Sequence, residues 1–200
     1  MQWITDHSQL ISALTSVGTL LVWVIYLQVF VHSYRRQLRA TLLITRGPGD
    51  GLASSCFLTN MSSGPVYVLS VFVTLETSDG TVVRSATNIQ DADSEGLSRP
   101  LERTRQGPLQ PGGIRDIGSF QRLMGHALQE ADSRSERIQA ITVVVLGTYG
   151  SEDLPVGARR RFLLTRTEDR LELHACKVDT EQVRKRSERR KLLEDLQRDQ

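Results

Sequence analysis

A run of 22 residues, from Leu10 to Val31, contains no Asp, Glu, Lys, Arg, Pro or His. A helix rises about 1.5 Å per residue, so this run spans roughly 33 Å and matches the roughly 30 Å hydrocarbon core of a bilayer. Thirteen of its residues are Leu, Ile, Val or Phe, which favour membrane insertion. We therefore expect a transmembrane helix over residues 10–34, preceded by a short extracytoplasmic segment, 1–9. The alternative is a buried core helix, although apolar runs in such helices are usually shorter.

The charges on the two sides of the apolar run differ. Asp6 precedes the run without any Lys or Arg, whereas Arg35, Arg36 and Arg39 follow it closely. Positive residues favour the cytoplasmic side, so we expect a single-pass, N-out/C-in anchor with the remainder in the cytoplasm, at the inner membrane if the source is bacterial. A cleaved signal peptide would need a positive segment before a shorter apolar run, and this pattern is missing. The alternative orientation exports the remainder of the chain.

Beyond residue 37 the apolar residues alternate with polar ones, which predicts β-strands with one buried face. The best-defined strand is 66–77, and an Asp79-Gly80 turn connects it to a return strand, 81–86. Between residues 120 and 133, apolar residues recur at intervals of three and four and predict one short helix. The other predicted strands are 39–45, 53–59, 113–120, 138–148, 159–167 and 171–176.

This number of strands, joined mostly by short turns, predicts an antiparallel β-sandwich of the immunoglobulin-like type over residues 37–176. The Cys-Trp-Cys hallmark of antibody domains is missing, because the two cysteines are Cys56 and Cys176 and the two tryptophans precede both of them. No set of diagnostic residues resembles a known family. The fold prediction therefore rests on the strand pattern alone.

The overall charge is nearly balanced, with 25 Lys and Arg against 23 Asp and Glu. A net charge of +2 predicts no general attraction to nucleic acid, so any electrostatic function must be local. Neither a phosphate loop, nor a nucleophile elbow, nor a zinc-ligand spacing occurs in the sequence. The glycine cluster between Gly47 and Gly51 is predicted to be a turn between strands. We therefore expect no enzyme activity and no cofactor.

Residues 88–111 form a long connection rich in charge, Gly and Pro, and connections of this length are often functional or disordered. Four carboxylates within it, with Gly96 at the sixth place, are spaced like the ligands of an EF-hand calcium loop. Ser98, Arg99 and Pro100 depart from that pattern, and no flanking helices are predicted. A plain solvated loop is therefore the favoured interpretation. The candidate metal ligands are Asp91, Asp93, Glu95 and Glu102.

The tail, 177–200, is almost wholly charged and is predicted to be an exposed helix. Asp179 and Gln182 have the spacing of a capping box, and Glu181 lies four residues before Lys185. Together with the arginines after the apolar run, its cations form a candidate surface for an anionic membrane leaflet or a partner protein. No aromatic residues lie among them, which disfavours nucleic acid. A solvated helix is the alternative. The tail cations are Arg184, Lys185, Arg186, Arg189, Arg190 and Lys191.

Three serines, Ser8, Ser12 and Ser16, recur every four residues just before and within the start of the apolar run and place small side chains in one stripe. Such a stripe lets another helix approach closely, which would support a homo-oligomer or a larger membrane complex. The alternative is that the hydroxyls bond back to their own helix.

These patterns favour a membrane-anchored, non-catalytic interaction or scaffolding module, as an accessory subunit of a membrane complex. The lipid bilayer is one expected partner, and an unidentified protein is the other. The alternative is a membrane-tethered sensor or effector that binds a ligand, such as a metal ion, at the 88–111 loop and passes the event to the helix.

Overall fold

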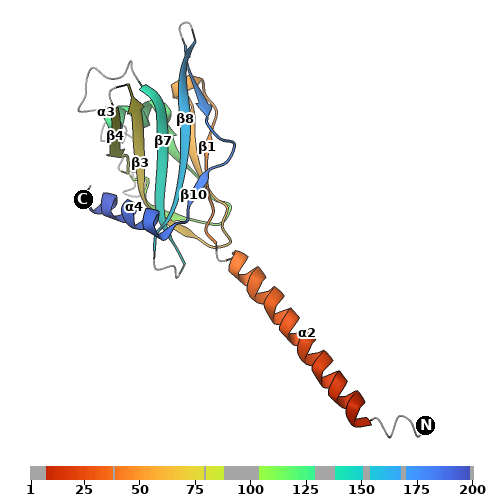
Figure 1. The fold of residues 1–200 in the computed structure, drawn as a ribbon. Helices are drawn as coiled ribbons and strands as arrows, with labels where there is room; N and C mark the ends of the chain where they lie inside the picture. The colour runs from red at the N-terminus through yellow and green to blue at the C-terminus, as the bar shows by residue number, and fades with distance from the viewer. Residues whose placement is uncertain are drawn as a thin grey trace. The chain divides into compact units, whose positions relative to one another are not determined.

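The computed structural model describes residues 8–37, 39–78, 80–87, 104–128, 138–150, 154–167 and 170–198. It forms two compact units, Met1–Arg39 and Ala40–Gln200, which are described separately below. The first unit is the helix α2, and the second holds the strands and the other two helices, α3 and α4 (Figure 1).

The first unit contains one long helix, α2 (Ser8–Gln37). The 23-residue stretch Ser12–Tyr34 is long and apolar enough to cross a membrane, and none of it is buried by protein. Large apolar side chains such as Leu20 and Ile25 are about 60% exposed, at 63% and 60%. A core helix would bury such side chains, so α2 is not a core helix of this chain.

The second unit is built mostly from strands, in the order in which the alternating pattern predicts them. Its helices are the 3-10 helix η1 (Gly51–Ala53), α3 (Phe120–Leu128) and α4 (Arg186–Arg198). The strands are β1 (Leu42–Arg46), β2 (Ser55–Asn60), β3 (Val66–Thr77), β4 (Gly80–Ser85), β5 (Gly107–Leu109), β6 (Ile114–Ser119), β7 (Ile138–Tyr149), β8 (Val156–Thr167), β9 (Arg170–Ala175) and β10 (Glu181–Val183).

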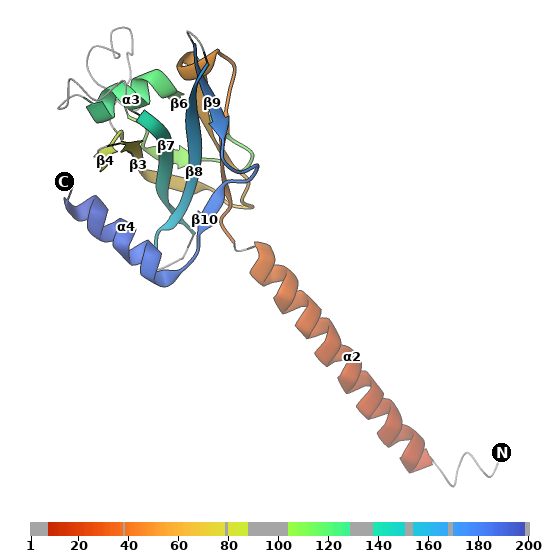
Figure 2. The ribbon, with the colours of Figure 1, turned by 45° about the horizontal axis from the view of Figure 1, so that its top comes forward.

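The strands form two sheets in which every pairing is antiparallel. The smaller sheet has the order β1-β2-β6, and the larger has β10-β8-β7-β3-β4. Two edges of the larger sheet are shared: β10 and β9 pair with successive parts of β8, and β5 and β4 pair with successive parts of β3. Figures 1 and 2 show the long strands β3, β7 and β8 side by side.

The hydrophobic core draws side chains from both sheets and from α3. Phe120 of α3 meets Phe162 of β8 edge to face, with ring centroids 4.8 Å apart, and both rings are fully buried. Each such side chain contributes roughly 1.5–3 kcal/mol on burial, so the domain has an ample core of its own. The other large members include Leu42, Ile44, Leu58, Val71, Val73, Leu75, Ile117, Leu123, Ile141, Val143 and Val145.

The prediction of an apolar helix followed by a mainly antiparallel, sheet-rich domain with one short internal helix is confirmed. The glycine cluster is also a turn, as predicted. Gly51 has φ of 50°, and a Cβ atom there would lie 2.2 Å from the carbonyl oxygen of Leu171, so only glycine fits this position.

The tail differs from the exposed helix predicted over residues 177–200. Residues 181–183 form the strand β10, and α4 begins only at Arg186. The capping-box spacing of Asp179 and Gln182 was misleading because the side chains of Thr180 and Gln182 bind β1 instead. Val183 is also buried, at 3% exposure, so this part of the tail belongs to the folded domain.

The predicted 88–111 loop also differs at its carboxyl end. Gly107–Leu109 forms β5 and pairs with the start of β3. Just before it, Arg105 is buried at 4% exposure and donates hydrogen bonds to the carbonyl oxygens of Ile117 and Ala86, at 2.5 and 2.6 Å. Arg105 therefore belongs to the folded domain, although the composition of the surrounding sequence is typical of a loop, because its hydrogen bonds satisfy buried backbone carbonyls.

Candidate functional site

The tail cations predicted as a surface lie in and just before α4. Arg184, Lys185 and Arg186 are exposed, as are Arg190 and Lys191. Arg189 is half-buried, and its Nε donates to the carbonyl oxygen of Val183 at 3.1 Å. The structure therefore places these six cations in one short stretch at the end of β10.

The arginines after the apolar run lie elsewhere, in and beyond the last turn of α2. Arg35 and Arg36 are in the last turn of the helix, and Arg39 is exposed just after it. Arg39 is the last residue of the first unit, and Ala40 begins the second.

Two polar side chains of the tail bind the free edge of β1. Gln182 Oε1 accepts a hydrogen bond from the backbone N–H of Leu42 at 3.1 Å, and its Nε2 donates to the carbonyl oxygen of the same residue. Two residues further along β1, Thr180 Oγ1 accepts from the N–H of Ile44 at 2.9 Å and donates to its carbonyl at 3.2 Å. We call this pair of side chains the latch.

The latch joins the two sheets, because β10 itself pairs with β8 of the larger sheet while Thr180 and Gln182 pair with β1 of the smaller one. It satisfies backbone groups that an edge strand would otherwise leave open. It also fixes the beginning of the tail beside the first strand of the domain.

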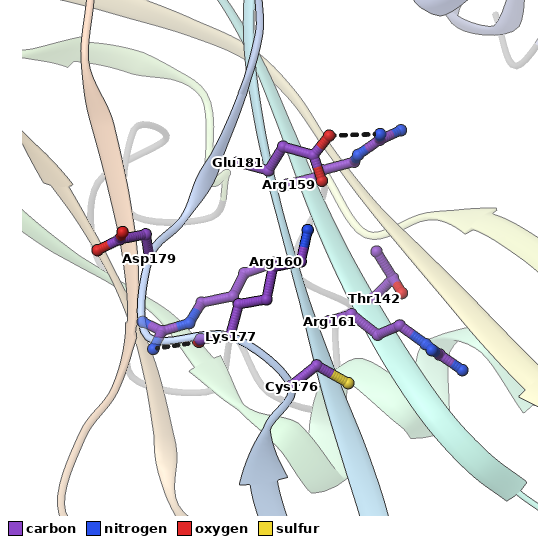
Figure 3. A pocket seen from close by; sticks show the side chains of 8 residues that line it. All are labelled: Thr142, Arg159, Arg160, Arg161, Cys176, Lys177, Asp179 and Glu181. Atoms are coloured by element: carbon purple, nitrogen blue, oxygen red, sulfur yellow. Dashed lines mark hydrogen bonds and ion pairs between the residues drawn. The ribbon is translucent and has the colours of Figure 1, made fainter.

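A shallow hollow of about 390 Å³ lies where the chain passes from β9 to β10. Figure 3 shows its side chains: Arg159 and Arg161 point to one side, and Arg160 points to the other. The remaining lining residues are Thr142, Cys176, Lys177, Asp179 and Glu181.

The arginines of the hollow are already engaged by protein groups. Arg159 binds Glu181 at 2.7 Å, and Arg161 binds Glu76 at 2.5 Å. The hydrogen bond from Arg159 lowers the pKa of Glu181, so this carboxylate stays ionised. Arg160 donates to the carbonyl oxygens of Ile44 and Val178, the latter at 2.9 Å.

These pairings assign the hollow a structural role. Its lining includes the exposed thiol of Cys176 but no histidine that could act as a base for it. Arg160 also lies over the ring of Phe162, 5.5 Å from its centroid, and so connects the core to both sheets.

Three other sequence hypotheses have different outcomes. The calcium candidates Asp91, Asp93, Glu95 and Glu102 lie outside the described residues. Within the described ranges, no group of three or more His, Cys, Asp or Glu residues could hold a metal ion. Glu172 and His174 lie on one face of β9 and contact each other at 3.1 Å on an exposed surface.

One hydroxyl of the serine stripe of α2, that of Ser16, is bonded back to its own helix, as is the hydroxyl of the nearby Thr19. Ser16 Oγ donates to the carbonyl oxygen of Ser12 at 2.9 Å, and Thr19 donates to that of Thr15 at 2.8 Å. This geometry favours the second interpretation of the stripe, in which the hydroxyls serve their own helix. Ser8 lies in the first turn of α2.

The two cysteines have opposite environments and are both free thiols. Cys56 is fully buried on β2, and desolvation raises its pKa from 9.0 to about 12. Cys176 is exposed at the end of β9. A buried neutral thiol is unreactive, because the thiolate is the nucleophile.

We expect a thiol reagent to modify Cys176 rapidly in the folded chain and Cys56 only after unfolding.

The raised pKa of Cys56 also makes the stability of the domain fall as the pH rises. The neutral thiol contributes to the free energy of unfolding below about pH 9, and this contribution is lost as the pH rises toward about 12. Between about pH 8 and about pH 11, wild type should lose about 2–3 kcal/mol more unfolding free energy than Cys56→Val. Urea titrations at both pH values test this, and equal losses in the two proteins would contradict it.

Comparison with known proteins adds no relative: no family model matches this chain, and neither the curated proteins nor the solved structures contain a match.

The sequence pattern missed the latch and Arg105. Thr180 and Gln182 are separated by one residue, and this spacing places two side chains on the same face of a strand. It is the one sequence pattern that could have indicated the latch. Arg105 lies among charged and Gly-Pro residues, and nothing in that local pattern marks it as buried.

Proposed function

We propose that this chain is a membrane-anchored, non-catalytic interaction module. In this proposal the stretch Ser12–Tyr34 spans the bilayer once, and the sheet domain is displayed on the cytoplasmic side. The observation that carries the proposal is a membrane-length apolar helix with no protein covering it, joined directly to a domain that has its own core. Apolar side chains left exposed along such a length need lipid or another helix around them.

The cytoplasmic orientation rests on charge asymmetry. Arg35, Arg36 and Arg39 follow the apolar stretch, whereas Asp6 precedes it without a cation. The free thiols of Cys56 and Cys176 are compatible with a reducing compartment.

We also infer an immunoglobulin-like layout for the domain, and the strand order supports this. Such sandwiches place strands A, B and E in one sheet and G, F, C and, in variable types, C′ in the other. The orders β1-β2-β6 and β8-β7-β3-β4 follow the same sequence of positions. The domain departs from the layout where β5 pairs with β3 and where α3 stands between β6 and β7.

The interaction role is supported by what the domain exposes. Val178 is 89% exposed, Ile114 is 67% exposed and Val83 is 50% exposed, so apolar contacts are available on separate elements. The arginines that line the hollow between β9 and β10 are held by carboxylates and backbone carbonyls of the fold. We therefore favour a role in binding other proteins over a role in catalysis.

Photo-crosslinking in intact membranes tests this function. A photoreactive residue is placed in turn at Val83, Ile114 and Val178, with the buried position Phe162 as the matched control. We expect at least one exposed position to give a discrete crosslinked protein that also co-purifies with the full chain from gently solubilised membranes. A chain that gives no adduct at any position and migrates alone would contradict the interaction role.

Mass spectrometry of the membrane-bound chain tests the anchor separately. We expect residues 1–34 to remain attached to the domain. A cleaved signal sequence can be as long and as apolar as α2. Recovery of a chain that lacks residues 1–34 would show that α2 is such a signal sequence and not an anchor.

A further inference from the structure

The segment 184–191, which we call the basic segment, concentrates positive charge in a nearly neutral protein. It contains six cations and one acid, Glu188, so its net charge is +5, compared with +2 for the whole chain. Five of the six cations have exposed side chains: Arg184, Lys185, Arg186, Arg190 and Lys191. A field of this size is strong enough to select a negatively charged partner.

The fold makes little use of these charges. Lys185 contacts Glu188 at 3.6 Å, and Arg189 binds a backbone carbonyl. Arg184, Arg186, Arg190 and Lys191 form no ion pair with any residue in the described part of the chain. By contrast, Arg159 and Arg161 of the neighbouring strand each hold a carboxylate.

Helix stability does not explain the charges either. The amino end of a helix carries a partial positive charge, which disfavours cations in the first turn. The helix α4 nevertheless begins at Arg186, directly after Arg184 and Lys185, and Arg189 and Arg190 follow in its first turn and a half. The cations are placed against the local preference, which is a feature of functional surfaces.

The latch fixes where this charge is presented. Gln182 binds Leu42, which lies three residues after Arg39, and Lys185 lies three residues after Gln182. Three residues span at most about 11 Å, so two such spans joined by the latch limit how far Lys185 can lie from Arg39. If the apolar helix spans the membrane, this limit keeps the basic segment within reach of the lipid surface.

The composition of the segment distinguishes between negatively charged partners. Single-stranded nucleic acid is usually bound through aromatic side chains that stack on bases, and residues 177–200 contain no Phe, Tyr or Trp. Anionic lipid headgroups require only clustered Lys and Arg near the bilayer.

We propose that the basic segment docks on the anionic phospholipid headgroups of the membrane that anchors the chain. This inference rests on the proposed function, because it requires α2 to span that membrane. Docking would fix the domain against the bilayer and determine which of its faces a partner can reach.

The test uses the full chain in nanodiscs. Ser187, which is exposed at the start of α4, is replaced by cysteine and labelled with a fluorophore in a Cys176→Ser background. Quenching by headgroup-labelled lipid is compared between discs of phosphatidylcholine alone and discs of phosphatidylcholine with phosphatidylglycerol. We expect strong quenching only in the anionic discs, and its loss at 1 M salt, where the Debye length is about 3 Å.

A charge variant and a matched control complete the test. Each cation near an anionic surface contributes about fivefold to docking, so the triple variant Arg184→Gln, Lys185→Gln and Arg186→Gln should weaken it on the order of a hundredfold. Replacing Arg84, Arg122 and Arg166 by Gln changes the net charge equally and should leave docking unchanged.

The outcomes separate the two proposals. A chain that does not remain in either disc would overturn the proposed function and this inference with it. A chain that remains in both discs but shows equal quenching would overturn this inference alone. A probe that responds to an oligonucleotide but not to anionic lipid would also overturn it and would indicate nucleic acid as the partner.

Discussion

Replacing Arg105 by methionine is expected to lower the free energy of unfolding of the domain by about 3–5 kcal/mol. The guanidinium is 4% exposed and donates to the carbonyl oxygens of Ile117 and Ala86, which lie on and beside strands of different sheets. Methionine has a similar length but no donor, so both buried carbonyls would lose their partners. A typical domain has only about 5–15 kcal/mol of stability, so the loss is a large part of the total.

Pulse labelling of Cys56 with a thiol reagent in increasing urea measures this loss, because Cys56 is fully buried in the folded domain. The matched control is Arg166→Met on an exposed part of β8, which should change stability by no more than about 0.5 kcal/mol. Equal effects of the two substitutions would show that Arg105 does not hold the sheets together.

Two arginines placed in the middle of the apolar helix are expected to abolish membrane integration. Leu20 and Ile25 lie within the stretch Ser12–Tyr34, and both side chains are exposed. Each arginine at the centre of a spanning helix costs about 2.5–3.5 kcal/mol and also removes an apolar side chain, so the double variant loses about 6–8 kcal/mol of insertion free energy.

Alkaline extraction of membranes measures this effect. Wild type should stay in the membrane pellet, and the Leu20→Arg, Ile25→Arg variant should move to the soluble fraction. The control variant Met61→Arg, Val178→Arg introduces the same charges at exposed apolar positions of the domain and should stay with wild type. Retention of the helix variant in the pellet would mean that α2 is not what holds the chain in the membrane.

The sequence predicts most of the strands because their signals are local and repeated. In 66–77 apolar residues recur at every second position from Tyr67 to Leu75 and a tight turn follows, so the strand and the hairpin follow from one pattern. The register does not follow at the start of the strand, where a β-bulge between Val68 and Ser70 leaves Tyr67 exposed and buries Val66 and Val68. The apolar helix is equally clear, since its length and composition do not depend on any other part of the chain.

The features that the sequence pattern misses depend on contacts between distant residues. Thr180 binds Ile44, 136 residues away, and Gln182 binds Leu42, 140 residues away. These long-range hydrogen bonds outweigh the local helix preference around Asp179, because they satisfy buried backbone groups on β1. Arg105 is a similar case, since its carbonyl acceptors come from other strands and loops.

The candidate surface could be predicted in part. The cations of the basic segment are visible in the sequence as a charge cluster, but their position at the end of β10 is not. That position follows from β10 and the latch, which only the fold reveals.

Thiol labelling of intact cells shows on which side of the membrane the domain lies. Two reporters with one added cysteine each are made in a Cys176→Ser background: Val178→Cys, at an apolar position that is 89% exposed, and Thr5→Cys, before the apolar helix. Cys56 stays in place because it is buried and its pKa is about 12. With a membrane-impermeant reagent, we expect labelling at residue 5 in intact cells and at residue 178 only after the cells are opened. Labelling of residue 178 in intact cells would place the domain outside the cytoplasm and contradict the proposed function.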